Sequence, residues 1–179
     1  MSTLLSNIRL APTTTAVSCA RIFTAHTLRT WGLPDLVQDA ELVVSELVTN
    51  AVRACGVLSP VPTWGELEGM QLLHLGIYGH GQSVNIQVWD SSLKPPIKPE
   101  AGGDDWTEHG RGLTIVEALA LHVGHFFPNT GGKVVWAELS AKEGLQPLPR
   151  RVAKELENVL LPLPDPDLLL RLLDALQRL

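Results

Sequence analysis

Glu46 and Asn50 place a carboxylate and an amide four residues apart, in the segment Glu46-Leu-Val-Thr-Asn50. Residues at this spacing lie one turn apart on the same side of a helix. Residues 35–54 predict such a helix, because their apolar side chains form one face, made of Leu36, Ala40, Val43, Val44, Leu47, Val48 and Ala51. Glu46 and Asn50 border that face. The spacing alone fits either a ligand site or a solvated edge with a Glu-to-Asn contact.

Asp90 follows the predicted strand 83–89 and opens a segment, residues 90–112, that is rich in proline, glycine and aspartate. A long segment without periodicity inside a compact domain usually has a function. An ionised carboxylate only accepts hydrogen bonds, so it selects ligand groups that donate them. The alternative is an aspartate that merely begins a turn.

Two glycines, Gly110 and Gly112, close this segment where a helix over residues 111–121 is predicted. Backbone amides at a helix start favour anions such as phosphate, because the helix dipole is positive there. His109 and Arg111 can add charge or hydrogen bonds. A Gly-x-Gly turn is weak evidence on its own, since the same glycines also suit a plain loop-to-helix connection.

The remaining pattern predicts the elements that hold these residues. A helix should run from the hydroxyls of Thr13–Thr15, which can cap it, to about Trp31, and residues 56–69 should form a loop. Strands are expected at residues 71–78 and 83–89, joined across Gly79–Gly81 as a hairpin, and again at 123–127 and 133–139.

The three segments occur in an order that resembles the GHKL ATPases, the fold of histidine kinases and bacterial anti-sigma kinases. Glu46–Asn50 resembles their N box, Trp89-Asp90 their first glycine box, and Gly110-Arg-Gly-Leu113 their second. The stretches ELVVSELVTNAVRA, EHGRGLTIVEALA and GGKVVWAEL are similar to the short actinobacterial anti-sigma factor kinases. The resemblance covers about residues 12–140.

The resemblance implies an α/β fold of the Bergerat type, a two-layer sandwich whose mixed, mostly antiparallel sheet carries helices on one face. It implies ATP and Mg²⁺ as cofactors, with Glu46 as the general base and Asn50 as the Mg²⁺ ligand. Asp90 would read the adenine amine, and the nucleotide would also contact His109, Gly110, Arg111, Gly112 and Leu113. The sequence departs from the family where the pattern Asp-x-Gly-x-Gly becomes Asp90-Ser-Ser-Leu-Lys94, with neither glycine present, and where Lys133 replaces a threonine.

The resemblance further implies an ATP-dependent serine/threonine kinase that acts on an anti-anti-sigma (STAS-like) partner, sequesters a sigma factor and so regulates transcription. The alternative is a non-catalytic regulator of the same fold that binds proteins and turns over little or no nucleotide. A two-component histidine kinase is disfavoured, because no dimerisation helix with a phosphoacceptor histidine precedes Glu46.

The charge and composition of the chain bear on which partners and which compartment are expected. A net charge of −5 and a pI near 5.6 argue against direct nucleic-acid binding. Neither a signal pattern nor an apolar run of membrane-spanning length is found, and Cys19 and Cys55 match no zinc or disulfide pattern, so a cytoplasmic protein is expected.

Two parts are predicted: an ATP-binding domain over residues 1–142 and a proline-punctuated extension over 143–179 that ends in a helix. The last stretch, residues 167–179, gathers its leucines on one face. That face would pack on its own domain, on a second copy as a homodimer, or on a partner.

Overall fold

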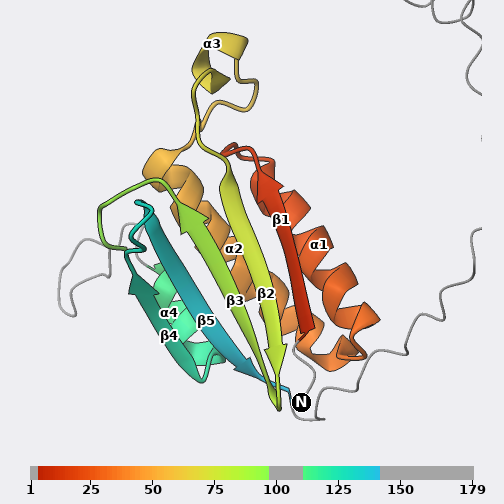
Figure 1. Ribbon diagram of the computed structural model, residues 1–179. Helices are drawn as coiled ribbons and strands as arrows, with labels where there is room; N and C mark the ends of the chain where they lie inside the picture. Colours follow the sequence, from red (N-terminus) through yellow and green to blue (C-terminus); the bar gives the residue numbers. More distant parts are fainter. Residues whose placement is uncertain (1–3, 97–110, 142–179) are drawn as a thin grey trace, which may run out of the picture. The chain divides into compact units, whose positions relative to one another are not determined.

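A computed structural model describes residues 4–96 and 111–141, which form a sheet covered by helices. All neighbouring strands are antiparallel, in the order β1-β2-β3-β5-β4 (Figure 1). The strands are β1 (Leu4–Leu10), β2 (Leu73–His80), β3 (Ser83–Asp90), β4 (His122–Phe126) and β5 (Lys133–Ser140). The sheet was expected to be mixed and mostly antiparallel, and its five described strands all pair antiparallel.

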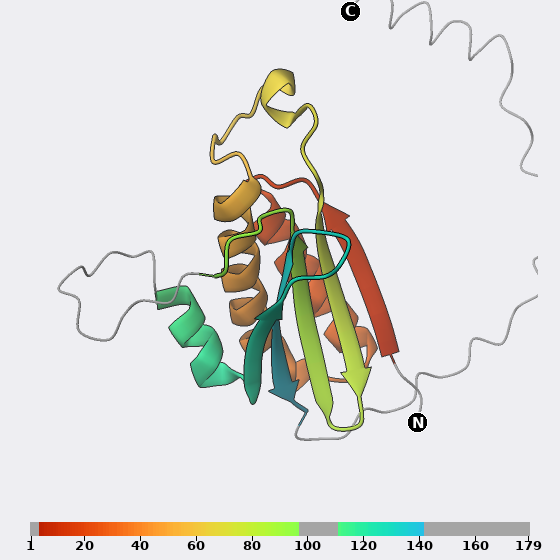
Figure 2. The same cartoon turned by 60° about the vertical axis from the view of Figure 1, so that its left-hand side comes forward.

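The helices α1 (Ala16–Thr30), α2 (Val37–Cys55) and α4 (Arg111–Leu119) lie on one face of this sheet, which Figure 2 shows from the side. The 3₁₀ turn η1 (Pro34–Leu36) joins α1 to α2, and the short α3 (Trp64–Leu67) lies beyond the end of the sheet (Figure 1). α2 is central, since it packs against α1, α4 and β3. The predicted two-layer α/β sandwich is therefore confirmed.

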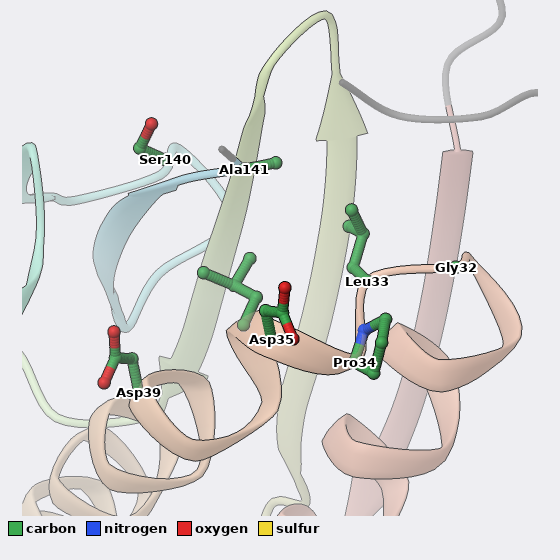
Figure 3. A pocket seen from close by; sticks show the side chains of 8 residues that line it. Gly32, Leu33, Pro34, Asp35, Asp39, Ser140 and Ala141 are labelled. Atoms are coloured by element: carbon green, nitrogen blue, oxygen red, sulfur yellow. The ribbon is translucent and has the colours of Figure 1, made fainter. Parts of the chain in front are cut away.

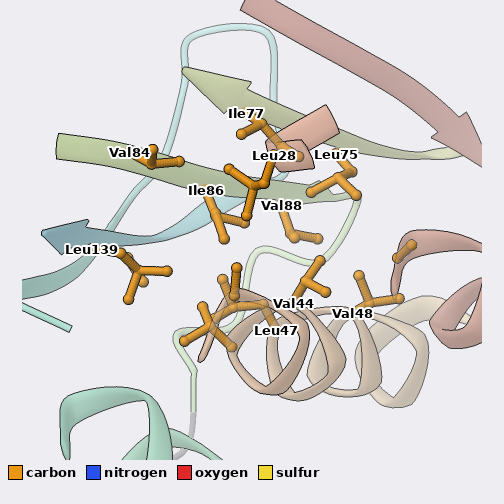
Figure 4. Close-up of a cluster of buried hydrophobic side chains, with 14 of the residues drawn as sticks. Leu28, Val44, Leu47, Val48, Leu75, Ile77, Val84, Ile86, Val88 and Leu139 are labelled. Carbon is orange, nitrogen blue, oxygen red and sulfur yellow. The ribbon is translucent and has the colours of Figure 1, made fainter. Parts of the chain in front are cut away.

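The apolar face predicted for residues 35–54 is the face that α2 buries. All seven of its residues are buried, and Val44, Leu47 and Val48 meet Ile86 and Val88 of the sheet in the core (Figure 4). Glu46 and Asn50 are half-buried at the edge of that face. The helical period therefore places this pair beside the sheet and still open to a ligand.

Alternation along β3 decides which side chains of that strand face the helices. Val84, Ile86, Val88 and Asp90 are buried, while the residues between them are half-buried on the other face. Successive strand residues point to opposite faces. Asp90 is thus the last residue of the core-facing row, at the end of the strand.

Several local predictions are wrong. Thr15 is the N-cap of α1 with helical dihedral angles and makes no side-chain cap; its hydroxyl pairs with that of Thr13 at 2.9 Å. An N-cap usually needs an extended backbone to reach the free amides. The connection between β2 and β3 is Gly81-Gln82, because His80 still pairs with Ser83 in the ladder.

The N-terminal segment around Ile8 and Leu10, which was not predicted as a strand, is the edge strand β1. Polar residues at Ser6, Asn7 and Arg9 hide its strand pattern, and pairing with β2 supplies what propensity does not. The predicted loop 56–69 also contains α3, which begins with a capping box between Thr63 and Glu66. Hydrogen bonds from Thr63 lower the pKa of that glutamate.

No helix of the described residues is long and apolar enough to cross a membrane. The predicted helix at 167–179 and the whole extension 143–179 lie outside the described residues, as does most of the segment 90–112.

Candidate functional site

A cavity of about 550 Å³ lies between α2 and the ends of β3 and β5. Its volume is in the range of small-molecule sites. Apolar walls come from both layers, Leu47 and Ala51 from α2 and Val88 and Val135 from the sheet. The polar or charged residues of the lining are Asn50, Arg53, Asp90, Ser92, Lys94 and Lys133. Ala54, Pro95 and Pro96 complete it.

Asn50 and Asp90, two of the residues singled out from the sequence, are brought together in this cavity. Helical spacing along α2 presents Asn50 at its wall, and strand alternation presents Asp90 from the other layer. The two residues are 40 positions apart in the chain, so only the packing of α2 on β3 makes them neighbours of one ligand.

Asp90 is almost fully buried and already has two hydrogen-bond donors on one carboxylate oxygen. The ammonium of Lys133 donates to Oδ1 at 2.8 Å, and the backbone N–H of Ser92 donates to the same atom at 2.9 Å. The exposed fractions of the two charged side chains are 5% for Lys133 and 1% for Asp90. Ser92 thus closes a local turn, and Lys133 neutralises the buried charge.

The turn before Lys133 is fastened to the end of β3. Trp89 Nε1 donates to the carbonyl of Gly131 at 3.0 Å, and Gly132 lies directly against the carbonyl oxygen of Asp90. Both glycines have positive φ, 88° and 73°, which is the left-handed region. Asp90 and Lys133 are also opposite each other in the β3–β5 ladder, so backbone geometry fixes the pair.

Glu46 lies one turn before Asn50 on α2, and its side chain contacts the first turn of α4. A Cβ added to Gly112 would collide with Glu46 Oε2, so the carboxylate lies against the glycine's Cα. The structure therefore joins the first of the three sequence segments to the third. The absence of a side chain at Gly112 leaves the space that the carboxylate occupies.

The other predicted residues differ in position. Arg111 begins α4, and the side chain of Leu113 is buried in the core rather than in the cavity lining. His109 and Gly110 lie outside the described residues.

Lys133 was noted in the sequence only as a replacement for a threonine, and its pairing with Asp90 was not foreseen. The signal would have been the order of the strands, because only a β3–β5 ladder sets residues 90 and 133 side by side. That order joins segments 43 positions apart and has no local pattern in the sequence.

Two further cavities hold none of the predicted residues. One, of about 320 Å³, lies near the start of α2 and carries Asp35 and Asp39 (Figure 3). The other, of about 560 Å³, is on the open face of the sheet beside His74, Tyr78 and Trp89. Burial, and then the charge of Arg9, lower the pKa of His74.

Comparison with known proteins agrees with this geometry. A family model described as the histidine kinase-like ATPase domain matches residues 10–139, well over half of the 179 residues. No curated protein matches the chain significantly. The matched range contains the cavity, the Glu46–Gly112 contact and every described strand except most of β1 and the last residue of β5. The chain therefore belongs to the histidine kinase-like ATPase domain family, a family of ATP-binding domains.

Proposed function

We propose that this protein is an ATP-dependent protein kinase that phosphorylates a serine or threonine of an anti-anti-sigma (STAS-like) partner. Through that partner, and by binding a sigma factor, it would regulate transcription. The observation that carries the proposal is the convergence of Asn50 and Asp90 in one cavity, with Glu46 one turn away against Gly112.

The cavity has the chemistry that a nucleotide needs. Its apolar walls, Leu47, Ala51, Val88 and Val135, suit a flat base, and Asp90 at its end accepts hydrogen bonds from an amine. The exposed side chains of Arg53 and Lys94 supply positive charge at the same cavity for phosphate groups.

Asn50 fits Mg²⁺, because a hard cation prefers oxygen ligands and the amide carbonyl offers one at the cavity wall. When bound, Mg²⁺ neutralises phosphate charge that builds up during transfer.

Glu46 is the candidate general base. Its carboxylate would accept the proton of the partner's serine hydroxyl as the hydroxyl oxygen bonds to the γ-phosphorus. The bond from that phosphorus to the β,γ-bridging oxygen breaks, and ADP leaves. Glu46 is a half-buried residue of α2 whose carboxylate lies against Gly112 in the first turn of α4. The helix dipole at that end of α4 favours the negative charge of the transferring group.

One observation favours a second candidate, a regulator that binds proteins with little or no turnover. Asp90 already accepts hydrogen bonds from Lys133 and Ser92, and Ser92 and Lys94 stand where the family pattern has glycines. An acceptor engaged in this way has fewer free sites for a base.

Transfer of labelled phosphate from ATP-Mg²⁺ to a purified STAS-like protein separates the two candidates. Glu46→Gln should lower the transfer rate by about 10²- to 10⁴-fold and leave the Kd for ATP within about twofold. Asn50→Ala should lower the transfer rate and also weaken ATP binding, because it removes the proposed Mg²⁺ ligand. Glu41→Gln on the same helix is the matched control and should behave as wild type.

Two results would count against the kinase. Undiminished transfer in Glu46→Gln would remove this residue as the base. ATP binding without transfer to any STAS-like protein would favour the non-catalytic regulator.

A further inference from the structure

The buried Lys133–Asp90 pair has no role in the transfer step described above, yet it forms part of the cavity wall. Lysine is rarely buried this far unless it is paired, because removing its charge from water is costly. Here the cost is offset by a 2.8 Å hydrogen bond to a carboxylate that is itself buried. The ammonium is therefore held at a fixed place in the cavity.

The position of the pair is set by the backbone. The two residues face each other at the end of the β3–β5 ladder, and the Gly131-Gly132 turn is pinned by the Trp89 hydrogen bond and by contact with the Asp90 carbonyl. These contacts fix the backbone of both residues relative to the turn.

Hydrogen-bond capacity remains on both partners. An ammonium has three N–H donors, and within the described residues one of them goes to Asp90. A carboxylate has about four acceptor sites on two oxygens, and two donors reach Oδ1. An acceptor and a donor therefore stand side by side at one cavity.

We propose that Lys133 reads the nucleotide base together with Asp90. Asp90 accepts from the exocyclic amine of adenine, and the ammonium of Lys133 donates to the neighbouring ring nitrogen, N1. This inference rests on the proposed ATP binding and adds a second specificity-determining residue to that site.

The same two groups explain why guanine fits poorly. Guanine carries a carbonyl oxygen where adenine has the amine, and a ring N–H where adenine has the N1 acceptor. In the adenine position its oxygen would face the Asp90 carboxylate and its N–H would face the Lys133 ammonium. Two like groups would meet at each contact, so the pair selects adenine over guanine.

The test compares ATP with 1-deaza-ATP, in which N1 is replaced by C–H, by titration calorimetry on the full chain with Mg²⁺. Wild type should bind the analogue about 10- to 100-fold more weakly than ATP, the usual effect of a lost hydrogen bond to a charged donor. Lys133→Met should bind ATP that much more weakly and no longer distinguish the two nucleotides. Lys94→Met, at the exposed rim of the same cavity, should keep the wild-type ratio.

Equal wild-type affinities for ATP and 1-deaza-ATP would overturn the inference without any variant. Tighter ATP binding by Lys133→Met would also overturn it, since the lysine would then obstruct Asp90. If Lys133→Met does not fold, Lys133→Met with Asp90→Asn removes both charges, and this variant should also lose the ratio. If wild type binds neither nucleotide, the proposed ATP site itself is wrong.

Discussion

Gly112 is the residue of α4 against which Glu46, the proposed general base, lies. Its φ is not positive, so the α4 backbone accepts alanine, but the new Cβ would take the place of Glu46 Oε2. The obstacle is the end of a flexible side chain, which can turn away. We expect Gly112→Ala to change the free energy of unfolding by no more than about 1 kcal/mol, in the stabilising direction.

Displacement of the Glu46 carboxylate by the new Cβ should slow the proposed phosphoryl transfer by about 10- to 100-fold, because small misplacements of catalytic groups have effects of that size. Transfer assays and urea denaturation measure the two quantities. Gly65→Ala in α3, where an added Cβ meets nothing within 4 Å, is the control and should keep normal transfer. Normal transfer by Gly112→Ala would mean that the Glu46 carboxylate acts from another position.

Gly131 and Gly132 form a matched pair, since both have positive φ but only Gly132 has close neighbours. Alanine at either position is strained by about 1–2 kcal/mol. At Gly132 the Cβ would also collide with the carbonyl oxygen of Asp90 and lie 2.7 Å from the Trp89 ring. Gly132→Ala should therefore lose about 1–3 kcal/mol more stability than Gly131→Ala.

The same two variants test whether the Gly131-Gly132 turn positions Asp90 and Lys133, the residues proposed to contact adenine. ATP affinity should fall in Gly132→Ala and stay near wild type in Gly131→Ala, measured by titration calorimetry beside urea denaturation. Equal losses in both variants would show that φ strain alone matters and that the Asp90 contact does not.

Part of this site could be predicted from the residue types and their spacing. Glu46, Asn50 and Asp90 stand out because an amphipathic period and a strand end predict where their side chains lie. Lys133 does not stand out, because its role depends on a partner across a non-consecutive strand pair. Ser92 was noted as a missing glycine, whereas its backbone N–H is a donor to Asp90.

At the level of elements, α2 carries both the core and the site, and its two faces can be tested separately. Leu47 is 1% exposed and Leu42 is 46% exposed on the same helix. Leu47→Ala should lower the free energy of unfolding by about 2–5 kcal/mol, since it removes buried atoms and leaves a cavity. Leu42→Ala should stay within about 0.5 kcal/mol in the same urea titration. Similar losses for the two would contradict the placement of the helix.

Element boundaries were predicted to within one or two residues where periodicity is strong, as in α2 and β5. They were less accurate where a turn or tertiary pairing decides. His80 looks like part of a glycine turn but extends β2, because Gly81 alone supplies the positive φ that the turn needs. β1 was missed as a strand, because an edge strand with alternating polar residues gains its stability from its neighbour.

At the scale of the whole molecule, the sequence predicts the two layers but not the order of the strands. Helical and strand periods tell which faces are apolar, and apolar faces must be covered. The position of β5 between β3 and β4 depends on long-range strand pairing, and β5 also packs against α2. This pairing brings the residues of the cavity together.

The apolar core of the described domain ends at Ala141, which is buried and donates its backbone N–H to the Gln82 carbonyl at 2.8 Å. The leucine face at residues 167–179 is short for an independent helix, because helices below about 12–15 residues are marginal in water. We therefore expect that face to be covered by its own domain, by a second copy or by a partner, and prolines 162, 164 and 166 would form a stiff spacer that favours the last two.

Deleting residues 144–179 should leave the domain folded and its ATP affinity unchanged, because the cavity and the Ala141 contact remain. In both forms, ATP-Mg²⁺ at about 100 times its Kd should add roughly 2.7 kcal/mol of stability. Self-association or partner binding should fall, as measured by light scattering and by titration with the STAS-like protein. Loss of ATP binding together with unfolding would show instead that the leucine face packs on its own domain and completes the core.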